Sequence, residues 1–277
     1  MNNLIKQLEA RLMAAGSGNA KRAVEELAAH VLGCKPLEIY FKTITLEQQA
    51  ELEKLIVRAE QGEPIQHIIG HVDFRGLEIH CDRRALIPRP ETELLVDAVL
   101  SLIGNRQSSI VIADVGTGTG CIALALLAEL PNAEVIGVDV SPDALSLAKE
   151  NAERLGFGGR FKTLQNNLLG GFPENSLDIV VSNPPYILSG VCKTLDRSVR
   201  DYEPKLALDG GADGLDLIRP LVSQAVRVLK PGGGLFLEIG YDQGRAVDHV
   251  LKNAGFQRVE IIKDLAGLDR IAVGFRS

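Results

Sequence analysis

The chain has 277 residues and a formal net charge of −6. Its apolar share of 45% and charged share of 24% are typical of a folded globular protein and exclude a disordered or fibrous chain. The acidic balance argues against phosphate-driven binding of nucleic acid, and the 4% aromatic content argues against stacking on single strands. No apolar run approaches the roughly 20 residues that cross a bilayer, and no signal-peptide pattern is present. We therefore expect a cytoplasmic protein with reduced, scattered cysteines.

The start of the chain predicts a small helical domain. Leucines recur at helical spacing from Leu4 to Leu12, and a second apolar stripe follows after two glycines. Thr45 and Gln48 then form a capping box, which indicates the start of a third helix. We assign residues 1–64 to this domain.

The period of the apolar pattern changes in residues 65–87. Apolar and polar residues alternate on both sides of Arg75 and Gly76, which predicts a β-hairpin that links the helical domain to residues 88–277. Pro90 is suited to the first turn of the helix that follows.

The rest of the chain alternates short apolar strands with helices. This order predicts a doubly wound α/β sheet with right-handed crossovers. Ligands of such sheets bind at the carboxyl ends of the strands, near the point where the strand order reverses. The predicted strands are 110–114, 134–139, 161–164, 177–182 and 235–239, and the predicted helices are 122–130, 142–155 and 215–229.

A glycine-rich loop follows the first of these strands and consists of Gly116, Thr117, Gly118, Thr119 and Gly120. Glycine permits positive φ and lets backbone N–H groups approach a ligand closely. The dinucleotide fingerprint requires glycine or alanine where this chain has Cys121, so the spacing instead suits a cofactor whose amino-acid tail crosses the turn. Asp139 ends the second strand, where a carboxylate can accept both ribose hydroxyls of S-adenosylmethionine or of NAD.

A second loop follows the fourth strand and consists of Asn183, Pro184, Pro185 and Tyr186. Two prolines cannot continue a central strand, and their fixed φ sets the direction of the Pro184 carbonyl. The Asn183 side-chain oxygen and that carbonyl can accept both hydrogens of a planar NH2 group, against which Tyr186 can pack. Such a pair would turn the nitrogen lone pair toward an electrophile without any lysine, histidine or cysteine base.

The two loops resemble those of class I amino-group methyltransferases, and the segment Leu86–Glu93 (LIPRPETE) narrows the resemblance to the release factor glutamine methyltransferases. The resemblance covers essentially the whole chain. It implies a seven-stranded Rossmann-like sheet whose last, antiparallel strand is supplied by residues 269–275. It also implies methyl transfer from S-adenosylmethionine to the side-chain nitrogen (N5) of the glutamine in the GGQ motif of class 1 peptide chain release factors, with S-adenosylhomocysteine as product.

By this resemblance the glycine loop wraps the methionine part of the cofactor and Asp139 holds the ribose. Asn183 contacts both cofactor and substrate, and the Asn183–Tyr186 loop grips the glutamine amide. The family's acidic and aromatic pair near the adenine is replaced here by Asn167 and Leu168. Asn167 can still bond the adenine edge, whereas the stacking partner is lost.

Three other functions fit parts of the pattern. Adenine-N6 methylation of DNA uses the same planar NH2, but it requires a flipped base and a basic surface, which the net charge disfavours. A cofactor-binding module without catalysis would not need the Asn183 loop, and an NAD oxidoreductase is disfavoured by Cys121. We expect no metal, because the histidines lack carboxylates at ligand spacing, and we expect a monomer without nucleic-acid or membrane partners.

Overall fold

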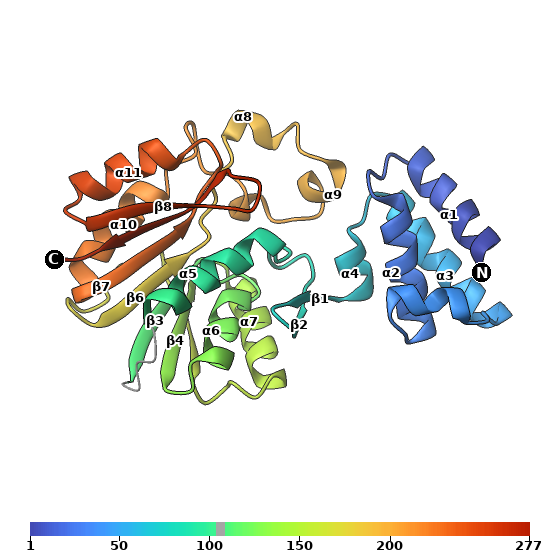
Figure 1. Cartoon of the computed structure of the whole chain (residues 1–277), viewed down its shortest axis with the longest axis horizontal. Coiled ribbons are helices and arrows are strands. Elements are labelled where there is room, and N and C mark those ends of the chain that lie inside the picture. The colour runs from blue at the N-terminus through green and yellow to red at the C-terminus, as the bar shows by residue number, and fades with distance from the viewer. Residues whose placement is uncertain (104–108) are drawn as a thin grey trace. The chain divides into compact units, whose positions relative to one another are not determined.

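The computed structural model describes residues 1–103 and 109–277, which form two compact units (Figure 1). The first unit comprises Met1–His71 and Asp196–Tyr202, and the second comprises Val72–Leu195 and Glu203–Ser277. No described helix is both long and apolar enough to span a bilayer.

The first unit is a helical bundle around its own apolar core. The core residues with 1% exposure or less include Leu12, Val24, Leu27, Leu52 and Ile56. The capping box predicted for the third helix is confirmed, because Thr45 Oγ1 accepts the Gln48 N–H and the Gln48 side chain accepts the Thr45 N–H. The helices of this unit are α1 (Asn2–Ala14), α2 (Ala20–Leu32), a 3-10 helix (Pro36–Phe41), α3 (Leu46–Glu60), α4 (Ile65–Ile69) and α9 (Arg197–Arg200).

The hairpin is shorter than the sequence predicted, because residues 65–69 form helix α4. Pro64 stands at the N-cap of α4, and Ile68 faces the core of the first unit. The helix ends at Gly70, whose φ of 90° only glycine adopts readily. The run of apolar residues fitted both helix and strand, and the left-handed glycine decides for the helix.

The hairpin itself consists of β1 (His71–Phe74) and β2 (Leu77–His80), joined by the predicted turn. Arg75 and Gly76 have φ values of 52° and 74°, and positive φ at both central residues matches the twist of the flanking strands.

Helix α9 was not predicted as part of the first unit, since it follows α4 by more than a hundred residues in the sequence. The Tyr202 hydroxyl donates to the Gln61 carbonyl at 3.1 Å, and a Cβ at Gly62 would lie 3.0 Å from the Arg197 side chain. The predicted division into 1–64, 65–87 and 88–277 therefore differs from the two observed units, because the chain after the Asn183 loop returns to the first unit.

The second unit contains the predicted seven-stranded sheet, in the order β5-β4-β3-β6-β7-β9-β8. Strand β9 runs antiparallel to β7 and β8, as expected for 269–275, whereas β8 was not predicted. The strands are β3 (Ile110–Val115), β4 (Ala133–Asp139), β5 (Phe161–Gln165), β6 (Leu177–Ser182), β7 (Leu229–Glu238), β8 (Gln257–Lys263) and β9 (Asp269–Phe275). The helices are a 3-10 turn (Pro90–Thr92), α5 (Glu93–Ile103), α6 (Cys121–Glu129), α7 (Pro142–Arg154), α8 (Ser189–Cys192), a 3-10 turn (Lys205–Ala207), α10 (Ile218–Val228) and α11 (Gly244–Asn253).

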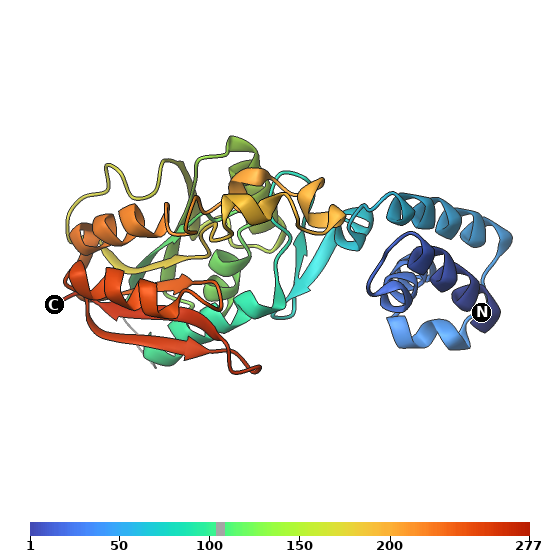
Figure 2. The same ribbon diagram turned by 90° about the horizontal axis from the view of Figure 1, so that it is seen from above.

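Helices cover both faces of this sheet (Figure 2). Ile112 of β3 packs in one apolar core with α5 and α6, and its neighbour Ala113 packs in a second core with α10 and α11. The alternation of side chains along the strands thus gives each face its own core.

The strand order reverses between β3 and β6. These two strands are parallel neighbours, although β4 and β5 lie between them in the chain. Val115 pairs with Ser182, so the loops that leave the two strands begin side by side. This edge is the binding position expected of a doubly wound sheet.

Replacing the helix cap in Thr45→Ala removes one acceptor from the start of α3. We expect α3 to lose about 1 kcal/mol of local stability, because the Gln48 N–H in the first turn loses its partner. Amide hydrogen exchange along α3 measures this loss, with Thr43→Ala as the control for an exposed threonine of the same unit. Unchanged exchange in Thr45→Ala would contradict the assigned cap.

Candidate active site

The glycine loop adopts a conformation that requires glycine. Gly116, Gly118 and Gly120 have φ values of 72°, 54° and 82°. A Cβ at Gly120 would lie 3.2 Å from the Ala148 Cβ, so this glycine also lets α6 approach α7. The loop presents backbone at the carboxyl end of β3, which is the cradle that a cofactor tail needs.

Asp139 lies at the end of β4, half-buried beside the glycine loop. Its Oδ2 accepts the Gly118 N–H at 3.1 Å and its Oδ1 accepts the Ser141 N–H at 3.0 Å. Each carboxylate oxygen has a further lone pair for a hydroxyl donor. Backbone amides thus fix the orientation of Asp139, the residue predicted to bind the ribose hydroxyls.

Asn167 and Leu168 follow β5, the neighbour of β4. The Asn167 side chain is exposed, and Leu168 is half-buried against the core that contains α10. Leu168 has φ 54°, which is unusual for a bulky residue. The two residues lie beyond Gln165, the strand partner of Asp139.

The Asn183 loop meets the glycine loop at the sheet edge. A Cβ at Gly116 would lie 3.9 Å from the Asn183 carbonyl oxygen. The Asn183 Nδ2 donates to Thr92 Oγ1 at 3.1 Å, and the Tyr186 hydroxyl donates to Glu238 at 3.2 Å. The two loops that sequence analysis singled out are therefore adjacent.

The backbone of the Asn183 loop is covered by residues that sequence analysis missed. Gln243 Nε2 donates to the Tyr186 carbonyl at 3.1 Å. A Cβ at Gly210 would lie 2.7 Å from the Pro185 carbonyl, so only glycine fits there. The three glycines at positions 210, 211 and 214 were a visible signal in the sequence, whereas nothing local marks Gln243.

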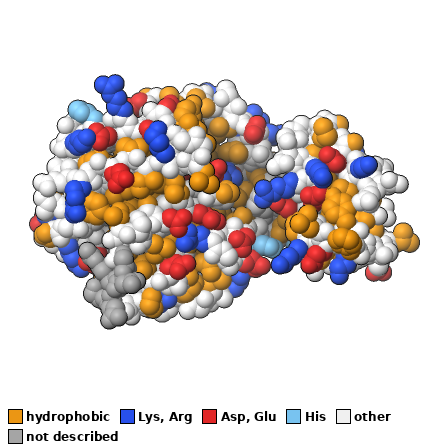
Figure 3. Space-filling view, in the orientation of Figure 1, with side chains coloured by type: hydrophobic (Ala, Val, Ile, Leu, Met, Phe, Trp, Pro, Cys, Tyr) orange, Lys and Arg blue, Asp and Glu red, His pale blue; other side chains and the backbone are white. Residues whose placement is uncertain are grey.

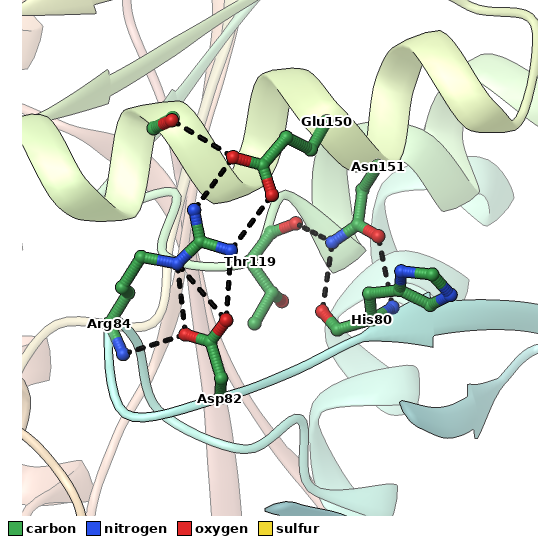
Figure 4. Close-up of polar contacts among 7 residues, drawn as sticks. His80, Asp82, Arg84, Thr119, Glu150 and Asn151 are labelled. Atoms are coloured by element: carbon green, nitrogen blue, oxygen red, sulfur yellow. Dashed lines mark hydrogen bonds and ion pairs between the residues drawn. The ribbon is translucent and has the colours of Figure 1, made fainter. Parts of the chain in front are cut away.

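The arginines near the LIPRPETE segment are engaged in ion pairs. Arg89 pairs with Glu203 at 2.6 Å, and the Glu203 side chain is only 1% exposed. Arg84 bridges Asp82 and Glu150 at 2.8 and 2.7 Å (Figure 4). Both arginines therefore brace the segment that leads to Thr92.

Asn151 ties the end of β2 to the glycine loop (Figure 4). Its side chain is fully buried, accepts the His80 N–H at 2.9 Å, and donates to the His80 and Thr119 carbonyls at 2.9 and 3.0 Å. The neighbouring Ala85 then lies over the loop, since a Cβ at Gly118 would be 3.7 Å from it.

Asp114 at the end of β3 is buried and accepts the Thr117 hydroxyl at 2.7 Å. Burial raises the pKa of Asp114 from its ordinary value of 3.8 to about 7, against the lowering effect of the Thr117 bond. In the described residues, no group of three His, Cys, Asp or Glu side chains could hold a metal ion.

The substitution Asn151→Ala leaves the His80 N–H, the His80 carbonyl and the buried Thr119 carbonyl without their side-chain partner. We expect a loss of about 2–4 kcal/mol of stability and a weaker cofactor site. Urea unfolding measures the first and titration with S-adenosylhomocysteine the second. The exposed Asn253→Ala serves as control, and equal unfolding midpoints in the two variants would refute the structural role of Asn151.

The buried Asp114 predicts a pH dependence of stability. The folded protein holds this proton more tightly than the unfolded chain, so the unfolding free energy falls as the pH rises from 3.8 to about 7. Asp114→Asn cannot titrate, so its unfolding free energy should fall less over this range. Both unfolding free energies are measured against pH without cofactor. The same pH dependence in the wild type and in Asp114→Asn would contradict the raised pKa of Asp114.

Known proteins resemble this chain over most of its length. A family model described as the PrmC N-terminal domain matches residues 3–70, and one described as a methyltransferase domain matches residues 106–265. The chain is 41% identical to the release factor glutamine methyltransferase of Caulobacter vibrioides, over 92% of this chain and 88% of that protein. It is 40% identical to that of Agrobacterium fabrum, over 94% and 92% of the two chains.

A solved structure supports the fold alone. The crystal structure of a methyltransferase from Pyrococcus furiosus covers 84% of this chain and all of its own, with 18% identity and a TM-score of 0.55. The identities over nearly full length show the family. The chain belongs to the release factor glutamine methyltransferases and is an S-adenosylmethionine-dependent enzyme.

Proposed function

We propose that this enzyme methylates the N5 side-chain nitrogen of the glutamine in the GGQ motif of class 1 peptide chain release factors. The position of Asn183 beside the glycine loop carries the proposal, because it puts an amide-binding group next to a cofactor cradle. The names of the relatives support the choice of substrate.

The described residues fit S-adenosylmethionine. The positive-φ glycines give its methionine part a backbone cradle, and both Asp139 oxygens have lone pairs for the ribose hydroxyls. Asn167 and Leu168 then lie near the adenine. When bound, this cofactor supplies a methyl group on a positively charged sulfur.

Asn183 and Pro184 bind the substrate amide in this proposal. The Asn183 Oδ1 and the Pro184 carbonyl accept the two N–H groups of the glutamine, while Pro185 has no N–H to compete. Accepting these bonds stabilises the positive charge that develops on nitrogen, by about 3 kcal/mol for each well-placed dipole. The nitrogen gains the methyl group and loses one proton to water, so no protein base is required. Tyr186 packs beside the planar amide.

The alternative substrate, adenine in DNA, has less support. On the face shown in Figure 3, basic side chains are interspersed with acidic ones, and the net charge is −6. A basic field along a groove is what duplex binding requires. A translation factor as substrate also agrees with a cytoplasmic enzyme that works as a monomer without nucleic acid, and these three properties stay predictions.

The substitution Asn183→Ala removes the side chain that binds the substrate amide and so tests the proposed chemistry. We expect kcat to fall by about a hundredfold or more, while cofactor affinity stays within about twofold, because the side chain acts mainly on the developing charge. The rate of methylation is measured by mass spectrometry, as the addition of one methyl group to the GGQ glutamine of a release factor. Calorimetry measures the cofactor affinity. Asn253→Ala is the matched control.

Two results would defeat this function. A folded, cofactor-bound enzyme that adds no methyl to a release factor would remove the substrate assignment. Methyl incorporation into duplex DNA that falls steeply with salt would favour the DNA enzyme instead.

A further inference from the structure

Four side chains form one continuous hydrogen-bonded chain behind the amide-binding group. Asn183 Nδ2 lies 3.1 Å from Thr92 Oγ1, and Thr92 Oγ1 lies 2.7 Å from Glu238 Oε2. The other oxygen of Glu238 accepts the Tyr186 hydroxyl at 3.2 Å. The chain thus starts and ends in the Asn183 loop and passes through the LIPRPETE segment and the end of β7.

The donors and acceptors of this chain can be assigned from its one carboxylate. An ionised Glu238 only accepts, so the single hydrogens of the Thr92 and Tyr186 hydroxyls both go to it. The Thr92 oxygen is then left as an acceptor, and it must meet the NH2 side of Asn183. The Asn183 Oδ1 consequently faces away from Thr92.

From this we infer that Glu238 and Thr92 are positioning residues, which fix the Asn183 carboxamide with its oxygen toward the substrate amide. This inference rests on the proposed function, in which that oxygen accepts a glutamine N–H. The two ends of a carboxamide have nearly the same size, so packing alone does not choose between them. A reversed Asn183 would point its NH2 at the NH2 of the substrate, and the acceptor pair with Pro184 would be lost.

Thr92 and Glu238 are both shielded from water. Thr92 is 2% exposed and Glu238 is 1% exposed, so water does not replace either partner. The Tyr186 hydroxyl is fixed by the same carboxylate, which couples both ends of the loop to Glu238. Loss of one member therefore affects the orientation of Asn183 rather than the shape of the site alone.

The surroundings of Glu238 bear on its charge. Burial raises the pKa of Glu238, and the nearby carboxylate of Glu91 adds to this, whereas the Thr92 and Tyr186 bonds and the positive Arg270 lower it. Arg270 is itself paired with Asp264 at 3.0 Å. A protonated Glu238 would donate to a hydroxyl and could reverse the chain, so kcat should show an acid limb that depends on Glu238.

The test compares Thr92→Val, which removes the hydroxyl at nearly constant volume, with Thr92→Ser, which keeps it. We expect Thr92→Val to lower kcat by about tenfold or more, with cofactor affinity within about twofold, and Thr92→Ser to stay within about threefold of wild type. Thr194→Val, which also loses one hydroxyl hydrogen bond, is the control.

The double mutant Thr92→Val/Asn183→Ala separates a positioning role of Thr92 from a purely structural one. Since Thr92 acts through Asn183, Thr92→Val should cause little further loss in an Asn183→Ala background. Glu238→Gln is the second variant, should Thr92→Val not fold. Its amide accepts at the oxygen but donates at the NH2, so it cannot accept from both hydroxyls. We therefore expect kcat to fall and the acid limb to disappear.

The outcomes distinguish this inference from the proposed function. Normal kcat in Thr92→Val, fully additive losses in the double mutant, or an unchanged acid limb in Glu238→Gln would each overturn the positioning role. Normal kcat in Asn183→Ala would instead overturn the proposed role of Asn183 as ligand of the substrate amide, and a release factor that gains no methyl group would overturn the proposed substrate.

Discussion

The pairing of β3 with β6 is the constraint on which the site depends. Because the strand order reverses there, Val115 and Ser182 are paired although the chain between them forms two further strands and helices. The Ser182 hydroxyl also donates to the Val115 carbonyl at 2.6 Å, which locks the two strand ends together. The glycine loop and the Asn183 loop, the proposed cofactor and amide sites, are thus held side by side by the backbone of the sheet.

Each loop is then fixed by a buried carboxamide from elsewhere in the second unit. Asn151 of α7 holds the Thr119 carbonyl, and Gln243 holds the Tyr186 carbonyl. A carboxamide can donate and accept at once, so one side chain satisfies several backbone groups that have left the sheet. Methyl transfer depends on alignment more than on acid–base groups, and this rigidity supplies alignment.

Local signals predicted the parts of the site that have local causes. Positive φ requires glycine at Gly116 and Gly118, and prolines must end β6, so both loops could be identified from spacing alone. The residues that orient Asn183 could not, because Thr92 is 91 positions away from it and the Glu238 carboxylate is 146 positions from Thr92. Glu238 was visible only as an acidic residue at the end of an apolar strand.

The fold shows the same division between local and distant causes. Strands β3 and β6 of the parallel part follow from apolar runs, while β8 has no buried residue and lacks such a run. Helix α4 was taken for strand because five residues do not separate the two periods. The return of Asp196–Tyr202 to the first unit rests on contacts such as Tyr202 with Gln61, 141 positions apart, which no sequence pattern marks.

The central claim concerns the direction in which the Asn183 carboxamide points. Neutron diffraction from crystals with S-adenosylhomocysteine and a glutamine peptide would show the hydrogens directly. The account predicts deuterons on Asn183 Nδ2 facing Thr92, with Oδ1 and the Pro184 carbonyl each bonded to the glutamine side chain. Oδ1 bonded to Thr92, or a glutamine bound away from both acceptors, would contradict it.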